Sequence, residues 1–132
     1  AIFRIPAILG IKSKNNFLSN LIIKIKKNEK VFLTNPNLMF NNAIHVKNIF
    51  QIVLKSIKKK REKNTYNLAS RNKMKLIKII KLIYKIMKKK EQFIFTKSDK
   101  KGFNININRG LKNKYIFYSI KKTITLFSKD NL

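Results

Sequence analysis

The segment "NKMKLIKIIKLIYKIMKKK" (residues 72–90) has a lysine at every third or fourth position, and isoleucine, leucine, methionine and tyrosine between the lysines. A period of 3.6 residues fits this pattern and a period of two does not, so the segment is predicted to be an amphipathic helix. Isoleucine has only a modest helix propensity, so tertiary burial of the apolar arc must stabilise the helix. A protein core, a membrane surface or an anionic polymer could each accept one of its faces.

The residues on either side of this segment predict further elements. A second helix is expected over residues 44–60, where one face carries Val46, Ile49, Phe50, Val53 and Ile57. The sequence "TYNLAS" (residues 65–70) begins with β-favouring residues and predicts a short strand between the two helices.

After residue 90 the apolar period changes to two. The sequences "QFIFTK" (residues 92–97) and "FNININ" (residues 103–108) are expected to form a β-hairpin across a polar link, and "KYIFYSI" and "TITLF" (within residues 114–127) a further strand region. The predicted fold class is therefore α+β, with two helices packed on a small, mostly antiparallel sheet.

The first part of the chain is the least regular. Pro6 and Gly10 interrupt any helix, "NLIIKIKK" (residues 20–27) could be a short strand, and "FLTNPNLMFNN" (residues 32–42) is expected to be a loop. We therefore expect an irregular N-terminal extension over residues 1–43, an RNA-binding α+β domain over residues 44–127, and a C-terminal tail over residues 128–132.

The composition argues for a polyanionic partner. The 132 residues include 32 basic and 5 acidic side chains, a net charge of +27, while 44% of the residues are hydrophobic. A small folded domain with this charge is expected to bind nucleic acid or an acidic membrane surface. No window of eighteen uncharged apolar residues occurs, so no membrane insertion is expected.

The residues needed for catalysis are scarce. The sequence has no cysteine, one histidine (His45), five scattered carboxylates and three widely separated glycines. These residues offer no cysteine-ligated metal, no acid/base pair and no glycine-rich phosphate loop. The sequence therefore predicts a protein that is not an enzyme and that has no cofactor, no metal and no small-molecule substrate.

Collinear short motifs resemble the N-terminal domain of small-subunit ribosomal protein eight over residues 45–125. The matching positions are Ile57, Lys58, Asn72 to Lys75, Gln92 to Ile94, Lys114, Ile116, Phe117, Ile120, Lys122 and Ile124. The chain departs from that family in lacking the glycine before Phe93 and the C-terminal domain with its Ser-Thr-Ser-x-Gly motif. The resemblance implies a structural protein of the small ribosomal subunit that binds the central domain of the rRNA, beside neighbouring ribosomal proteins. A weaker resemblance, through "KKKEQF" (residues 88–93), is to small-subunit ribosomal protein ten.

Candidate RNA contacts lie at the ends of the predicted helices, on the hairpin link and in the last strand region. Cations there would neutralise phosphates without selecting a sequence. The candidates are Lys55, Lys58, Lys59, Lys60, Arg61, Lys63, Arg71, Lys73, Lys75, Lys97, Lys100, Lys101, Lys121 and Lys122. A basic amphipathic protein at a membrane surface is the alternative from another functional class.

The choice of residues also indicates the base composition of the gene. Lysine outnumbers arginine by 28 to 4, and asparagine, isoleucine and phenylalanine are abundant, all residues with AT-rich codons. We therefore expect an AT-rich organellar genome and a mitochondrial protein of the matrix ribosome, or a protein of another AT-rich organelle.

Overall fold

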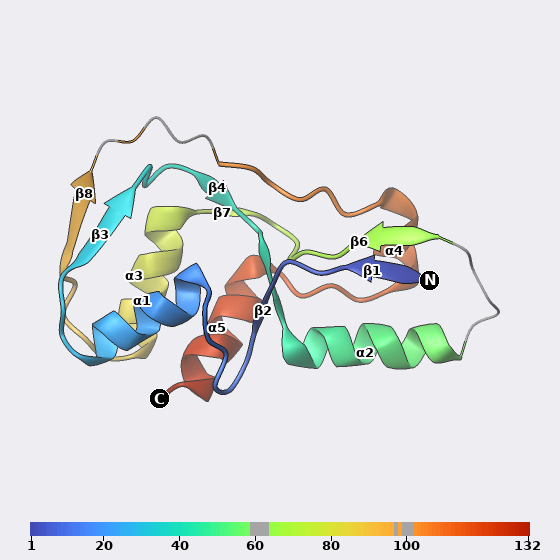
Figure 1. The fold of residues 1–132 in the computed structure, drawn as a ribbon, viewed down its shortest axis with the longest axis horizontal. Coiled ribbons are helices and arrows are strands. Elements are labelled where there is room, and N and C mark those ends of the chain that lie inside the picture. Colours follow the sequence, from blue (N-terminus) through green and yellow to red (C-terminus); the bar gives the residue numbers. More distant parts are fainter. Residues whose placement is uncertain (59–63, 97, 99–101) are drawn as a thin grey trace.

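The computed structural model describes residues 1–58, 64–96, 98 and 102–132 (Figure 1). Its helices are α1 (Phe17–Lys26), α2 (Val46–Ile57), α3 (Leu76–Ile86), α4 (Arg109–Lys114) and α5 (Ile120–Asp130). Its strands are β1 (Ile2–Arg4), β2 (Ala7–Leu9), β3 (Val31–Thr34), β4 (Met39–Phe40), β5 (Ala43–His45), β6 (Thr65–Asn67), β7 (Met74–Lys75) and β8 (Phe93–Thr96). The α+β class is confirmed at this level.

The strands pair two by two, and most of the pairs are parallel. In the described residues β1 pairs with β6, β2 with β5 and β3 with β8, all in parallel, whereas β4 and β7 are antiparallel. The expectation of a mostly antiparallel sheet is wrong. A parallel pair needs a crossover connection of roughly a dozen residues or more, so its partners cannot be found from neighbouring strand patterns.

The predicted hairpin after residue 90 is also absent. The first half of it is β8, but β8 pairs with β3 in the register Val31↔Phe93 to Thr34↔Thr96. Residues 103–107, although they alternate strictly, form no strand. Side chains of the β4–β5 connection bind their backbone instead, because Asn41 Nδ2 donates to the Ile105 carbonyl at 2.8 Å and Asn42 Nδ2 to the Phe103 carbonyl at 2.7 Å.

The predicted central helix is confirmed as α3, and it forms one of two apolar cores. Ile79, Ile80 and Ile83 are fully buried against α1, α5, β2 and β3, while the lysines at positions 78, 81 and 85 are exposed. Residues 74–75, which the periodicity assigned to the helix, form β7 instead. The apolar arc of this segment is therefore protein core.

The first 43 residues are not irregular. Helix α1 has a capping box in which the Asn16 side chain accepts from the Ser19 N–H at 2.9 Å, and Leu18, Leu21, Ile22 and Ile25 are buried in the α3 core. Residues 20–27, a possible strand from their pattern, lie mostly in α1. The loop expected over residues 32–42 is confirmed only at residues 35–38 and 41–42, because β3 and β4 occupy the rest. The division of the chain into domains at residues 43 and 127 stays a prediction.

The expected last strand region is helical. Helix α5 begins after Ser119, whose side chain accepts from the Lys122 N–H at 3.1 Å, and it buries Ile120, Thr123, Ile124 and Phe127. These positions follow the i, i+3, i+4, i+7 pattern of a helix face, and so do the buried residues of α1. The abundance of β-branched residues hid this period, because such residues also favour strands.

Helix α2 is confirmed, but the side of it that is buried differs from the prediction. Asn48 and Ile52 are buried against the second core, whereas Phe50 and Ile57 on the predicted core face are 63% and 74% exposed. The buried Asn48 amide donates to the Ile116 carbonyl at 2.7 Å and accepts from the Tyr118 N–H at 2.9 Å. These two bonds, rather than apolar periodicity, orient the helix.

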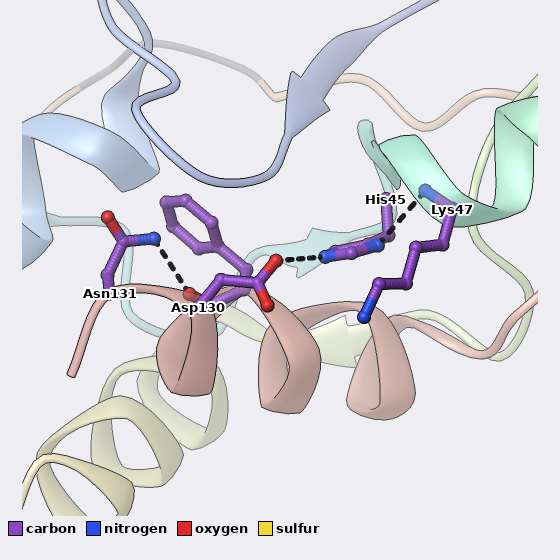
Figure 2. A network of polar contacts seen from close by, with 5 residues as sticks. His45, Lys47, Asp130 and Asn131 are labelled. Carbon is purple, nitrogen blue, oxygen red and sulfur yellow. Dashed lines mark hydrogen bonds and ion pairs between the residues drawn. The ribbon is translucent and has the colours of Figure 1, made fainter.

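A buried polar contact joins the start of α2 to the end of α5, as Figure 2 shows. His45 is fully buried, and its Nδ1 accepts from the Lys47 N–H at 3.2 Å. That contact requires the ring hydrogen to lie on Nε2, which donates to Asp130 Oδ2 at 2.9 Å. His45 therefore has a structural role as the N-cap of α2.

We predict that Asn48→Ala destabilises the fold by about 1–3 kcal/mol, because the Ile116 carbonyl and the Tyr118 N–H lose the partner that the buried Asn48 amide gives them. Urea unfolding measures the change in the free energy of unfolding. The exposed Gln51→Ala on the same helix is the control and should stay within about 0.5 kcal/mol of the parent. Equal effects of the two substitutions would contradict the role of the Asn48 amide.

The structure also predicts a loss of stability at alkaline pH. Burial raises the pKa of Tyr84 above 10.0; the Gln92 backbone opposes this shift and the charge of Glu91 adds to it. The unfolded chain therefore loses the phenol proton at lower pH than the folded chain, so the stabilisation is complete below about pH 10 and is lost above it. The free energy of unfolding should fall less steeply between about pH 9 and about pH 11 in Tyr84→Phe than in the parent. Parallel profiles would refute this assignment.

Candidate functional site

A hollow of about 490 Å³ lies where two parallel strands end. Arg4 and Asn67 are partners in the register of β1 and β6, and both side chains line the hollow from the carboxyl ends of these strands. Asn42 and the exposed ring of Phe103 contribute further parts of the wall. In open α/β structures ligands bind at the carboxyl ends of parallel strands, so this hollow is a candidate ligand site.

A second hollow of about 270 Å³ adjoins the first. Residues 104–106 line both hollows and thus form their shared wall. Asn41, residues 70–73 and Lys112 complete the smaller hollow. Residues 70–73 follow β6 after Leu68 and Ala69, so both hollows lie beyond the end of the β1–β6 pair.

Two asparagines hold the shared wall in place. Asn41, which is 7% exposed, binds both backbone groups of Ile105: its Nδ2 donates to the carbonyl at 2.8 Å and its Oδ1 accepts from the N–H at 3.1 Å. The same Nδ2 lies 3.3 Å from the Ser70 carbonyl. The Asn42 amide donates to Phe103, while its Oδ1 is buried and has no hydrogen-bond partner. The wall is therefore attached to the strands by side chains instead of a strand ladder.

The charge around the hollows has one sign. Arg4, Arg71, Lys73 and Lys112 all line them with exposed side chains, and no carboxylate is among the lining residues. The backbone of Arg71 is fixed, because its N–H donates to the Tyr118 carbonyl at 2.9 Å and its carbonyl accepts from the Ile120 N–H at 2.7 Å. One arginine side chain can donate two parallel hydrogen bonds to two oxygens of a phosphate, and a lysine acts as a point charge. This surface therefore suits a phosphate-bearing ligand.

The described residues bring binding groups to the hollows but no acid/base pair. Glu29, Glu91 and Asp130 line neither hollow, and His45 is committed to Asp130 and Lys47. Within the described ranges no three histidine, aspartate or glutamate side chains could hold a metal ion together. The chemistry that this surface supports is recognition of an anion.

Seven of the predicted RNA-contact residues can be placed. Arg71 and Lys73 line the smaller hollow. Lys75 lies in β7, Lys55 and Lys58 lie at the end of α2, and Lys121 and Lys122 lie in the first turn of α5, with the Lys122 Nζ 3.9 Å from the centre of the Tyr118 ring. Their contact with RNA stays a prediction. The other seven, Lys59, Lys60, Arg61, Lys63, Lys97, Lys100 and Lys101, lie outside the described residues.

The sequence pattern missed most of the lining residues. Arg4, Asn41, Asn42, Asn67 and Lys112 are scattered along the chain, and no spacing joins them. A polar residue at the last position of a strand, as Arg4 in β1 and Asn67 in β6, was the available indication of a ligand site. Asn104 and Asn106 line both hollows, but the sequence predicted them only as part of a strand over residues 103–108.

Comparison with solved structures shows the fold. A UDP-glucose 4-epimerase from Thermotoga maritima, solved with UDP-glucose, has a TM-score of 0.79 at 10% identity over 98% of this chain and 44% of its own. A dTDP-glucose 4,6-dehydratase from Bacillus anthracis in complex with NAD has a TM-score of 0.75 at 13% identity over 98% of this chain and 43% of its own. A dTDP-4-dehydrorhamnose reductase from Yersinia enterocolitica has a TM-score of 0.73 at 15% identity over 99% of this chain and 49% of its own. This chain thus spans less than half the length of each. No family profile and no curated protein sequence matches it.

These similarities overturn the functional expectations. The resemblances to ribosomal proteins eight and ten are wrong, and so are the expected roles in the ribosome, in rRNA binding and in translation, because the structures that share this fold are epimerases, dehydratases and reductases. The expectations that the chain is not an enzyme and has no small-molecule substrate are corrected for the same reason. The alternative of a membrane-surface protein is withdrawn with them. None of the described helices has the length and apolar character needed to cross a membrane.

We predict that Asn41→Ala loosens the shared wall, because the N–H and carbonyl of Ile105 lose their partner. Amide hydrogen exchange at Ile105 should accelerate by about tenfold or more. The exposed Asn20→Ala on α1 is the matched control and should leave that rate unchanged. If the exchange rate of Ile105 does not respond to Asn41→Ala, the wall is held by other contacts.

Proposed function

We propose that this chain is the sugar-nucleotide-binding part of an enzyme of the epimerase and dehydratase fold. The observation that carries the proposal is the group of four cations, without any carboxylate, around two adjoining hollows at the carboxyl ends of β1 and β6. A structure of this fold holds UDP-glucose, a ligand with a diphosphate, a base and a sugar. Such a ligand needs both cations and neutral hydrogen-bonding groups.

The residues divide into three roles in this proposal. Arg71, Lys73 and Lys112 bind the phosphate oxygens from the smaller hollow, with charge-assisted hydrogen bonds. Asn67 and Asn104 offer amide donors and acceptors to hydroxyl groups. Phe103, which is 70% exposed, offers an aromatic face to a base or to a sugar ring.

The residues of this chain do not fit a dinucleotide such as NAD, which similar structures hold. A dinucleotide site requires a glycine-rich turn between a strand and a helix. In the described residues β5 runs directly into α2 at His45 and β7 into α3 at Lys75, with no glycine at either junction. The connection from β2 to α1 holds a single glycine, Gly10, and residues 11–16 add none, so this turn is not glycine-rich. We therefore derive no hydride-transfer step from this chain.

The location of the protein stays a proposal as well. The excess of lysine, asparagine and isoleucine supports a gene in an AT-rich organellar genome, such as that of a mitochondrion. That inference concerns base composition and is independent of the ligand.

The proposal is tested by titrating the 132-residue chain with UDP-glucose in a calorimeter at about 0.15 M salt, where unspecific charge interactions are screened beyond about 8 Å. Arg71→Ala with Lys73→Ala should weaken binding about tenfold or more, because two charge-assisted contacts are lost. Lys78→Ala with Lys85→Ala removes the same charge from the exposed face of α3 and should change the affinity by less than about twofold.

Two results would contradict the proposal. One is an equal loss of affinity in the two double variants, which would show that only net charge attracts the ligand. The other is the absence of any binding of UDP-glucose to the parent chain.

A further inference from the structure

Arg4 stands apart from the other three cations of the hollows. Arg71, Lys73 and Lys112 line the smaller hollow, whereas Arg4 lines only the larger one, on the other side of the shared wall. Three cations are therefore available to the two phosphate groups of a sugar nucleotide in the smaller hollow. The part of the ligand that enters the larger hollow meets a further positive charge.

The strand pair fixes the position of Arg4. Arg4 is the last residue of β1, and its backbone carbonyl accepts from the Leu68 N–H at 2.9 Å. Its register partner is Asn67, the last residue of β6, and the two strands lie about 5 Å apart. Both side chains line the larger hollow. A guanidinium group and an amide group thus lie next to one another at one edge of this hollow.

The remainder of the larger hollow is uncharged. Residues 5–7, Asn42 and residues 103–106 complete its wall, and all of them are apolar or asparagine. The ion pairs between described residues do not include Arg4, and its side chain is exposed. The structure therefore leaves the charge of Arg4 to be matched by the ligand.

A carboxylate is the group of a sugar nucleotide that suits this position. The guanidinium group of arginine is planar, and two of its parallel N–H groups match the two oxygens of a carboxylate. A sugar hydroxyl offers a single oxygen, and neither the hydroxyl nor a neutral base carries a charge. The amide of Asn67, beside Arg4, can form a hydrogen bond with a hydroxyl near that carboxylate.

We propose that the substrate is a sugar nucleotide whose sugar is a uronic acid, and that Arg4 determines this specificity. Arg4 binds the two carboxylate oxygens of the sugar, Asn67 binds a neighbouring hydroxyl, and the exposed ring of Phe103 packs on the ligand from the opposite part of the chain. The diphosphate is bound by the three cations of the smaller hollow. The inference rests on the proposed function, because it requires the diphosphate to occupy that hollow.

The test compares two ligands that differ at one carbon atom. UDP-glucuronate has a carboxylate where UDP-glucose has a hydroxymethyl group, and each ligand is titrated into the 132-residue chain in a calorimeter at about 0.15 M salt. UDP-glucuronate is expected to bind about tenfold or more tightly than UDP-glucose, because it gains a charge-assisted pair of hydrogen bonds.

Two variants with the same change in charge locate this preference. Arg4→Gln should weaken the binding of UDP-glucuronate far more than that of UDP-glucose, so that the ratio of the two affinities falls to within about twofold of one. Lys24→Gln removes one charge from an exposed position on α1 and should leave the ratio unchanged. Both side chains are exposed, and urea unfolding of each variant checks that the fold is retained.

Four results would overturn the inference. Equal affinities of the parent chain for the two ligands would do so, and the proposed function would still stand if Arg71→Ala with Lys73→Ala weakened both. An equal loss for both ligands in Arg4→Gln would show that Arg4 binds the diphosphate. A ratio that falls equally in Lys24→Gln and in Arg4→Gln would result from net charge alone. Binding of neither ligand would overturn the proposed function together with this inference.

Discussion

The three residues of β5 are all buried, and the two apolar cores meet at this strand. Ala43 contributes to the core around α3, and Ile44, on the opposite side of the strand, contributes to the core around α2 and α4. The third residue, His45, caps α2 and binds Asp130 of α5. Because β5 pairs in parallel with β2, its position fixes Ala7 and Leu9 against the core around α3.

The hollows depend on the same strand through the residues that precede and contact it. Asn41 and Asn42 stand directly before β5, and they bind the backbone of residues 103–105. The Ser70 hydroxyl lies 2.7 Å from the Ala43 carbonyl and 2.8 Å from Thr123 Oγ1, so the segment that carries Arg71 and Lys73 is anchored to β5 and α5 at once. Buried hydrogen bonds of Ser70 thus hold the backbone segment that carries these exposed cations.

The functional misassignment has a physical cause. The order helix, strand, helix and then alternating residues is compatible with more than one fold, because it says nothing about which strands pair. The lysine excess pointed to a polyanion, but in an AT-rich gene such an excess also reflects codons. Four cations from three separate parts of the sequence gather around the hollows, and this grouping is more informative than the total of +27.

The sequence by itself determined the helices α2 and α3, the strand β6 and the strongly basic surface, because each depends on local periodicity or on composition. Only the tertiary structure decided that α1 and α5 are helices in spite of their β-branched residues, since burial of one face outweighs intrinsic propensity. It also decided that β8 pairs with β3, that Asn48 faces the core while Phe50 faces outward, and that Arg4, Asn67 and Arg71 line adjoining hollows. These outcomes depend on parallel crossovers and on side-chain bonds between distant residues, and no local pattern records either of them.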